Sequence, residues 1–231
     1  IRHISSISTY SSGQFMSLDR NSHRNLELIQ NLEDLSTANT LFDVLDATKT
    51  PMGKRLLKRS ILNPLLDVGA IKERLDAVQY FFDKGDTRKK AREHLSDIHD
   101  IERLSNKVSL GSANARDMTA LARSLGHIGR LKDILREDMP LKISEIAGGM
   151  DDFKDVIEWI DGCLVDEPPL QLKEGKLIRK GYDPEVDELR ELISSGKDWV
   201  ADLQKKEIER TGIGSLKVGY NRVFGLLYRD H

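Results

Sequence analysis

The stretch DPEVDELRELISSGKDWVADLQKKEIER, residues 183–210, decides the architecture that the sequence predicts. Asp183-Pro184 opens a helix, and the acids Asp183, Glu185, Asp187 and Glu188 stand at its positive end, which suits the helix macrodipole. At about 1.5 Å per residue the helix would be ~42 Å long. Its apolar residues form a narrow seam, and most of its circumference is charged. A polar helix of this length is typical of an arm that bridges two bodies or pairs with one partner helix.

The segments on either side of this helix are not helical in pattern. Gly212 and Gly214 end the helix. The residues from Ile213 to Tyr228 are rich in Val, Tyr and Phe around Gly219-Tyr220-Asn221-Arg222, a pattern that predicts two strands joined by a turn. On the other side, Asp166-Glu-Pro-Pro169 breaks the preceding helix, and Leu170 to Ile178 is expected to be a short extended connection.

Upstream, apolar spacing predicts a series of helices. Thr50-Pro51 is a strong helix start, because the hydroxyl caps free amides and proline suits the first helical position. We expect helices at about 51–62, 68–83, 86–97, 98–108, 114–136 and from Asp151 to Leu164, and a helical pattern from Asp19 through Leu26, Ile29 and Leu32. The segment 1–18 is interpreted as a short hairpin, although its serine content would also suit a disordered linker. The predicted fold class is mainly α.

Composition narrows the class of protein. The chain has 36 basic and 38 acidic residues, a net charge of −2, with 39% apolar residues, as in soluble globular proteins. This balance argues against indiscriminate binding to nucleic acid. No apolar run approaches the ~18–20 residues of a membrane span and no secretory signal is visible, so we expect a cytoplasmic protein without a membrane partner. Cys163 is the single cysteine, which excludes an internal disulfide, and a first residue other than Met suggests an excised piece.

Sequence motifs typical of catalytic, nucleotide-binding or metal sites are missing. The sequence contains no phosphate-binding G-x-x-x-x-G-K-[ST] loop, no G-x-S-x-G elbow and no H-E-x-x-H. The histidines are scattered, and His94 and His99 are five residues apart, on different faces of a helix. We therefore predict no catalytic residue, no metal site and no cofactor in this chain.

The remaining signal is electrostatic. Lys217, Arg222 and Arg229 alternate along the expected strand pair, together with the Asn221 amide and the Tyr220 hydroxyl, and this set has the ingredients of a phosphate contact. An ordinary solvated hairpin is an equally good interpretation. The basic helix Lys54–Arg59 is a second candidate, but its side chains are better interpreted as covering the edges of the core.

The order of segments resembles the core (lever) domain of the MutS family, the DNA mismatch-recognition ATPases. The segments that carry this resemblance are Met16–Asp19, Arg24–Leu28, Leu41–Asp46, Thr48–Leu57, Asn63–Leu65, Arg74–Val78, Asp100–Leu104, Ile178–Asp183, Glu185–Arg190, Glu209–Gly212, Ser215–Val218 and Tyr220–Asn221. Each segment alone is moderately specific, and together they cover nearly the whole chain in family order.

The resemblance implies a multi-helical lever with a long protruding helix, a short N-terminal β-hairpin and a small β element at the C-terminal tip. Residues 1–204 would be the core, with 1–18 at the connector border, and 205–231 the start of the clamp. Lys217, Tyr220, Asn221 and Arg222 fall where the family's clamp approaches DNA phosphates. The intact parent would bind ATP and Mg²⁺ and form a homodimer, with the rest of the MutS chain and the DNA backbone as this segment's partners.

The sequence also departs from the family pattern. The F-x-E mismatch-reading motif, the nucleotide-binding loop and the returning lever helix are not present, and Leu226-Leu227-Tyr228 replaces the usual paired aromatics. We therefore expect a module that neither discriminates mismatches nor hydrolyses ATP. Two alternatives stay open at this point: a MutS-related recombination protein, and a helical interaction scaffold without a DNA role.

Overall fold

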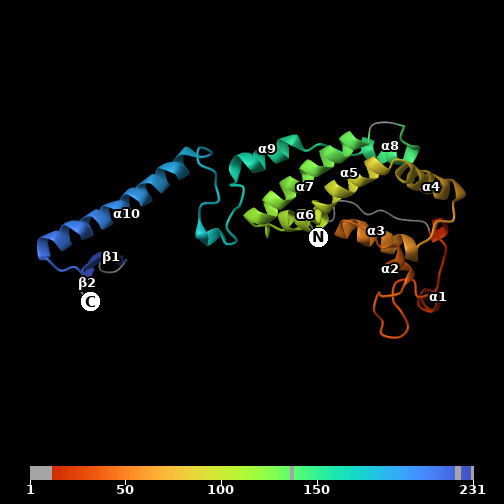
Figure 1. Ribbon diagram of the computed structural model, residues 1–231, viewed down its shortest axis with the longest axis horizontal. Coiled ribbons are helices and arrows are strands. Elements are labelled where there is room, and N and C mark those ends of the chain that lie inside the picture. The colour runs from red at the N-terminus through yellow and green to blue at the C-terminus, as the bar shows by residue number, and fades with distance from the viewer. Residues whose placement is uncertain (1–11, 136–137, 222–224, 230–231) are drawn as a thin grey trace. The chain divides into compact units, whose positions relative to one another are not determined.

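The computed structural model describes residues 12–135, 138–221 and 225–229, and its architecture is mainly helical (Figure 1). The chain divides into two compact units, residues 1–177 and 178–231. The helices of the first unit are α1 (Arg20–Asn25), α2 (Leu41–Leu45), α3 (Pro51–Leu62), α4 (Val68–Asp83), α5 (Gly85–Ser96), α6 (Ile101–Ser109), α7 (Ala115–Ile134), α8 (Leu141–Gly148) and α9 (Lys154–Cys163), with 3₁₀ turns η1 (Ser12–Gln14) and η2 (Leu172–Glu174).

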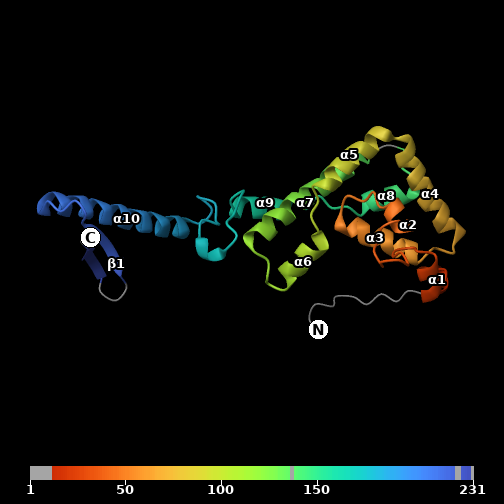
Figure 2. The ribbon, with the colours of Figure 1, turned by 60° about the horizontal axis from the view of Figure 1, so that its bottom comes forward.

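Helix α7 is the centre of the first unit. It packs against α5, α6 and α9, and both views show it running between these helices (Figure 1 and Figure 2). Leu121 and Leu125 of α7 form one buried cluster with Leu104 of α6. Further along α7, Leu131 forms a second cluster with Ala91 of α5 and Ile98. The apolar stripe predicted for residues 114–136 is therefore the core-facing side of this helix.

Side-chain caps begin most of these helices, and α3, α4 and α7 start where the sequence predicts. Thr50 Oγ1 accepts from the amide of Gly53 at 3.0 Å, with Pro51 at the first position of α3. At α7, Asn114 and Asp117 form a reciprocal capping box, each side chain accepting from the other's amide. Asp67 and Asp100 cap α4 and α6 without a reciprocal bond, each carboxylate accepting from the amide three residues on. These caps satisfy amides that have no partner inside the first turn.

The helical pattern expected through Leu26, Ile29 and Leu32 is wrong. After α1 the chain is irregular up to α2, and Glu27, Leu35 and Asn39 have positive φ angles. Polar side chains take the place of helical hydrogen bonds: Glu27 Oε1 accepts from the amide of Leu32 at 2.7 Å, and Asn31 Oδ1 from that of Asp34 at 3.0 Å. Such local side-chain bonds compete with helix formation, and they override the three-residue spacing.

Three further features differ from the sequence expectation. Helix α6 begins at Ile101, three residues after the expected residue 98, because Asp100 caps it. Helix α8 is absent from the predicted series, although its Ile143 and Ala147 are buried with Tyr80 of α4. Helix α9 begins at Lys154, three residues after the expected Asp151. The delay follows from Phe153, whose φ of 49° lies in the left-handed region and cannot continue a helix.

The N-terminal hairpin expected at 1–18 falls mainly on residues 1–11, outside the described residues. The part described contains η1, followed by an antiparallel bridge from Phe15 to Leu65. The amide of Met16 donates to the carbonyl of Pro64 at 2.8 Å. Phe15 thus pairs with the segment after α3, a long-range partner that local sequence does not reveal.

The second unit consists of helix α10 (Pro184–Thr211) and the antiparallel strands β1 (Lys217–Asn221) and β2 (Gly225–Arg229). Asp183 Oδ1 accepts from the amide of Glu185 at 2.9 Å and from that of Val186 at 3.3 Å, which fixes the start of α10. Gly212 ends it with a φ of 71°. Among the residues that the structure describes, no helix combines the length and apolar character needed to cross a membrane.

Candidate functional site

The β1–β2 hairpin is fixed to α10 by one edge of its first strand. Leu216 and Val218 are buried, and the amide of Val218 donates to Gln204 Oε1 of α10 at 3.0 Å. Lys217, between them in sequence, is exposed. Because side chains alternate along a strand, burial of Val218 leaves Lys217 on the solvent side. The first cation of the candidate site therefore stands on an anchored strand.

The candidate phosphate contacts are distributed as follows. Lys217 begins β1, Tyr220 and Asn221 end it, and Arg222 lies outside the described residues. Lys217 is the register partner of Arg229, and Asn221 of Gly225. The expected strand pair is present, with its connection after Asn221 rather than at 219–222. Two basic residues thus occupy opposite register positions of the strand pair.

The second candidate, the basic helix α3, is engaged within the fold. Lys54 Nζ lies 2.8 Å from Asp46 Oδ2. This hydrogen bond is the largest of the effects that lower the pKa of Asp46 to about 2. Arg55 donates to both carboxylate oxygens of Asp100, at 2.8 and 2.9 Å, and lowers the pKa of that carboxyl to about 2. Lys54 and Arg55 therefore form ion pairs with neighbouring segments, a role that the sequence interpretation of core coverage does not include.

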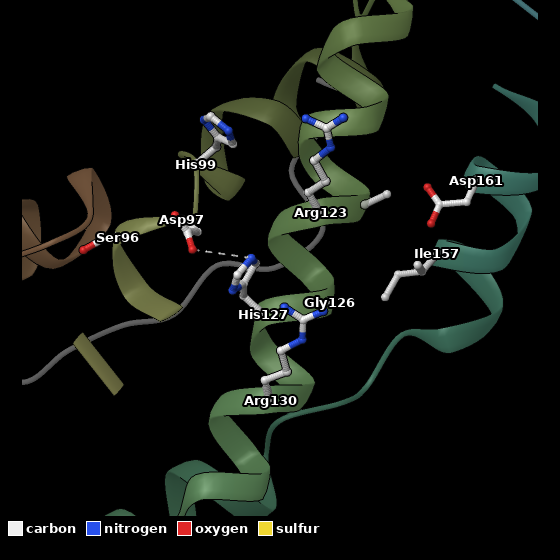
Figure 3. Close-up of a pocket in the computed structure, with 10 residues that line it drawn as sticks. Ser96, Asp97, His99, Arg123, Gly126, His127, Arg130, Ile157 and Asp161 are labelled. Atoms are coloured by element: carbon white, nitrogen blue, oxygen red, sulfur yellow. Dashed lines mark ion pairs between the residues drawn. The ribbon is translucent and has the colours of Figure 1, made fainter. Parts of the chain in front are cut away.

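An open hollow of about 520 Å³ lies on the side of α7. Figure 3 shows Arg123, His127 and Arg130 projecting from successive turns of α7, with Asp97 and His99 on one side and Ile157 and Asp161 of α9 on the other. Arg123 Nη2 donates to the carbonyl of Asp166 at 2.8 Å, and Arg116 Nε to that of Pro168 at 2.8 Å. The arginines of α7 therefore also hold the segment that follows α9.

His127 is the perturbed group of this hollow. Burial lowers its pKa below the usual value, Arg130 and His94 lower it further, and Asp97, whose Oδ2 lies 3.9 Å from His127 Nε2, opposes the shift. The Nδ1 atoms of His94 and His127 are 3.1 Å apart, so one ring donates to the other when both are neutral. The sequence gives no signal for this pair, because 33 residues separate its members and only the packing of α5 on α7 joins them.

Within the described residues, no group of three or more His, Cys, Asp and Glu side chains is arranged to hold a metal ion. The hollow on α7 thus places charged side chains beside a neutral imidazole. The hairpin contributes an exposed cation at the start of an anchored strand.

Comparison with known proteins gives one consistent result. A family model described as MutS domain III matches residues 21–212. The DNA mismatch repair protein MutS of Methanosarcina acetivorans is 45% identical over 229 residues, which cover 97% of this chain and 25% of that protein. MutS of Methanosarcina barkeri is 45% identical with the same coverage. MutS of Acetivibrio thermocellus is 42% identical over 226 residues, 97% of this chain and 26% of that protein. The chain thus spans about a quarter of the length of these relatives.

Proposed function

We infer that this chain, which belongs to the MutS family of DNA mismatch repair proteins, is a core and lever module that connects a DNA-gripping hairpin to an ATPase elsewhere in the parent protein. The observation that carries the proposal is the exposed Lys217 on a strand anchored to the end of a 28-residue helix. On this proposal residues 1–204 are the core and 205–231 the start of the clamp. The family match ends at residue 212, close to that division.

The grip is electrostatic and independent of base sequence. Lys217, Tyr220, Asn221 and Arg222 contact phosphates of a DNA duplex. Positioning of this kind fixes a protein on the backbone without reading bases.

Transmission depends on the stiffness of α10. The helix is capped at both ends, and at about 1.5 Å per residue its 28 residues extend ~42 Å. Arg190 Nη2 donates to the carbonyl of Ile178 at 2.8 Å and Nη1 to Asp187 at 3.1 Å, so the first turns are tied to the segment that enters the helix. A displacement at one end of such a rod reaches the other end. The parent protein would supply ATP and Mg²⁺ binding and a homodimer partner.

The grip is tested by the double variant Lys217→Glu plus Arg222→Glu, titrated with a short duplex against the wild-type chain. Phosphate contacts by the three cations of the strand pair, Lys217, Arg222 and Arg229, imply a log–log salt slope of about −3, a loss of roughly fortyfold in affinity between 50 and 200 mM salt. The double variant should bind at least about tenfold more weakly at 50 mM salt and with a shallower slope.

A charge-matched control is Lys173→Glu plus Lys176→Glu, two exposed lysines before the second unit. The control should retain wild-type affinity within about twofold. Equal binding by the hairpin variant and the wild type would remove the clamp assignment and leave a helical interaction scaffold as the better function.

A further inference from the structure

We propose that a groove on α5 is a second contact for the DNA backbone, separate from the hairpin. The groove has a volume of about 510 Å³ and is lined by Lys49, before α3, and by one face of α5. The α5 residues that line it are Gly85, Arg88, Lys89, Arg92, Glu93 and Ser96. Four cations and one carboxylate therefore surround it. The proposal rests on the proposed function in one respect: the ligand of the groove is the same class of molecule, duplex DNA.

The two arginines of the groove are fixed in place and keep their charge. Arg88 Nη1 donates to the carbonyls of Phe81 and Phe82, at 2.8 and 3.3 Å, at the end of α4. Arg92 Nη1 donates to the carbonyl of Ala47 at 2.9 Å. Carbonyl oxygens are neutral acceptors, so these bonds orient the guanidinium groups without cancelling their charge. This differs from Arg55 of α3, whose partners are carboxylates.

The two lysines are exposed, and neither Lys49 nor Lys89 forms an ion pair with any described carboxylate. Lys84, the residue before α5, makes no side-chain cap, and Gly85 at the first position lines the groove. The positive end of the α5 dipole therefore adds to the field of the four side chains. Glu93, which is exposed, and Asp86, in the first turn of α5, are the opposing charges.

The spacing of these cations matches adjacent phosphates of one DNA strand. Arg88, Lys89 and Arg92 lie within four steps of α5, about 6 Å at 1.5 Å per residue, and Lys49 adds a fourth charge. One strand of duplex DNA carries a phosphate about every 3.4 Å along the axis, so the α5 cations can face about two phosphates.

The test uses the full chain and the slope of duplex affinity against salt. Lys49→Gln plus Lys89→Gln removes two free cations of the groove, and the magnitude of the slope falls by about 0.9 for each phosphate that is no longer neutralised. We expect the slope to become shallower by about 2, and affinity at 50 mM salt to fall about tenfold. The matched control is Lys72→Gln plus Lys90→Gln, which removes the same charge from exposed positions of α4 and α5 outside the groove. The control should keep the wild-type slope.

Glu93→Gln should change duplex affinity in the opposite direction to the lysine variants. A misfolded variant would not bind the duplex more tightly. Removal of the groove's carboxylate should tighten duplex binding about threefold at 50 mM salt. An unchanged slope in the Lys49/Lys89 variant, or no gain in Glu93→Gln, would overturn the proposal. Failure here is distinguishable from failure of the hairpin, because the hairpin is tested by Lys217 and Arg222 alone: weaker binding in those variants with no effect of the groove variants leaves the clamp assignment standing.

Discussion

At the scale of single residues, the turn that starts α3 explains a glycine inside a helix. Thr50 Oγ1 accepts the amide hydrogen of Gly53, and a Cβ added at Gly53 would lie 3.0 Å from that same oxygen. A larger residue at this position would require the capping hydroxyl to shift by a few tenths of an ångström. The helical cost of glycine, roughly 0.5–1 kcal/mol relative to alanine, is thus offset by the retained cap.

The cap leads to a prediction for Thr50→Ala. The substitution leaves the amide of Gly53 without its side-chain acceptor, and we expect the free energy of unfolding to fall by about 1 kcal/mol, measured by urea denaturation. Thr50→Ser keeps the hydroxyl and should restore most of the stability. An equal decrease in the serine variant would show that the threonine methyl group, and not the cap, stabilises this turn.

At the scale of elements, the sequence predicts those helices whose first turn and apolar stripe agree. Helices α3, α4 and α7 begin next to Thr50, Asp67 and Asn114, and their starts match the expectation from spacing and capping residues. The segment after α1 misleads because its apolar spacing is helical while Asn31 and Glu27 use their side chains to bond the local backbone. Apolar periodicity shows which residues could face a core. It does not show whether the backbone forms helical hydrogen bonds or bonds to nearby side chains.

In the candidate site, too, some features can be predicted from local sequence and others depend on long-range contacts. Charge and glycine content indicate a basic strand pair after the long helix, and that prediction needs only local sequence. The groove on α5 and the His94–His127 pair depend on contacts over 33 residues or more, between segments that the fold alone brings together. Lys49, for example, is separated from Arg88 in the chain by helices α3 and α4.

Helix α10 has a cap at its start and none of its described side chains is buried, so the cap should matter more than its apolar seam. Asp183→Ala removes the acceptor for the amides of Glu185 and Val186, and we expect it to destabilise the helix by about 1 kcal/mol. The readout is amide hydrogen exchange in residues 184–190. Leu192→Gln, at a side chain that is 61% exposed, should change exchange by less than about 0.5 kcal/mol. A larger effect of Leu192→Gln than of Asp183→Ala would contradict this ranking.

At the scale of the whole molecule, acid sensitivity separates into two pH ranges. Asp46 and Asp100 have pKa values of about 2, below their ordinary 3.8, because Lys54 and Arg55 hydrogen-bond the charged carboxylates. The stability that they provide is present above about pH 4 and is lost as the pH falls toward 2. Between pH 7.5 and 5.5 these two carboxylates stay ionised in both states, so a change in stability there must come from other groups.

His127 is the group that we expect to act in that range. Burial lowers its pKa in the folded chain below the usual 6.5, so the unfolded chain binds a proton first as the pH falls. Stability from neutral His127 is therefore complete above about pH 6.5 and declines as the pH drops through that value toward the lower folded pKa. The free energy of unfolding should decrease from pH 7.5 to 5.5 in the wild-type chain, and this decrease should be smaller in His127→Gln.

His99→Gln is the matched control, since His99 lines the same hollow and is exposed. It should keep the wild-type pH dependence, as followed by urea denaturation at each pH. If His127→Gln and His99→Gln show the same slope as the wild type, protonation of His127 is not coupled to folding, and the packing of α5 on α7 would have to tolerate a charged imidazole beside His94 and Arg130.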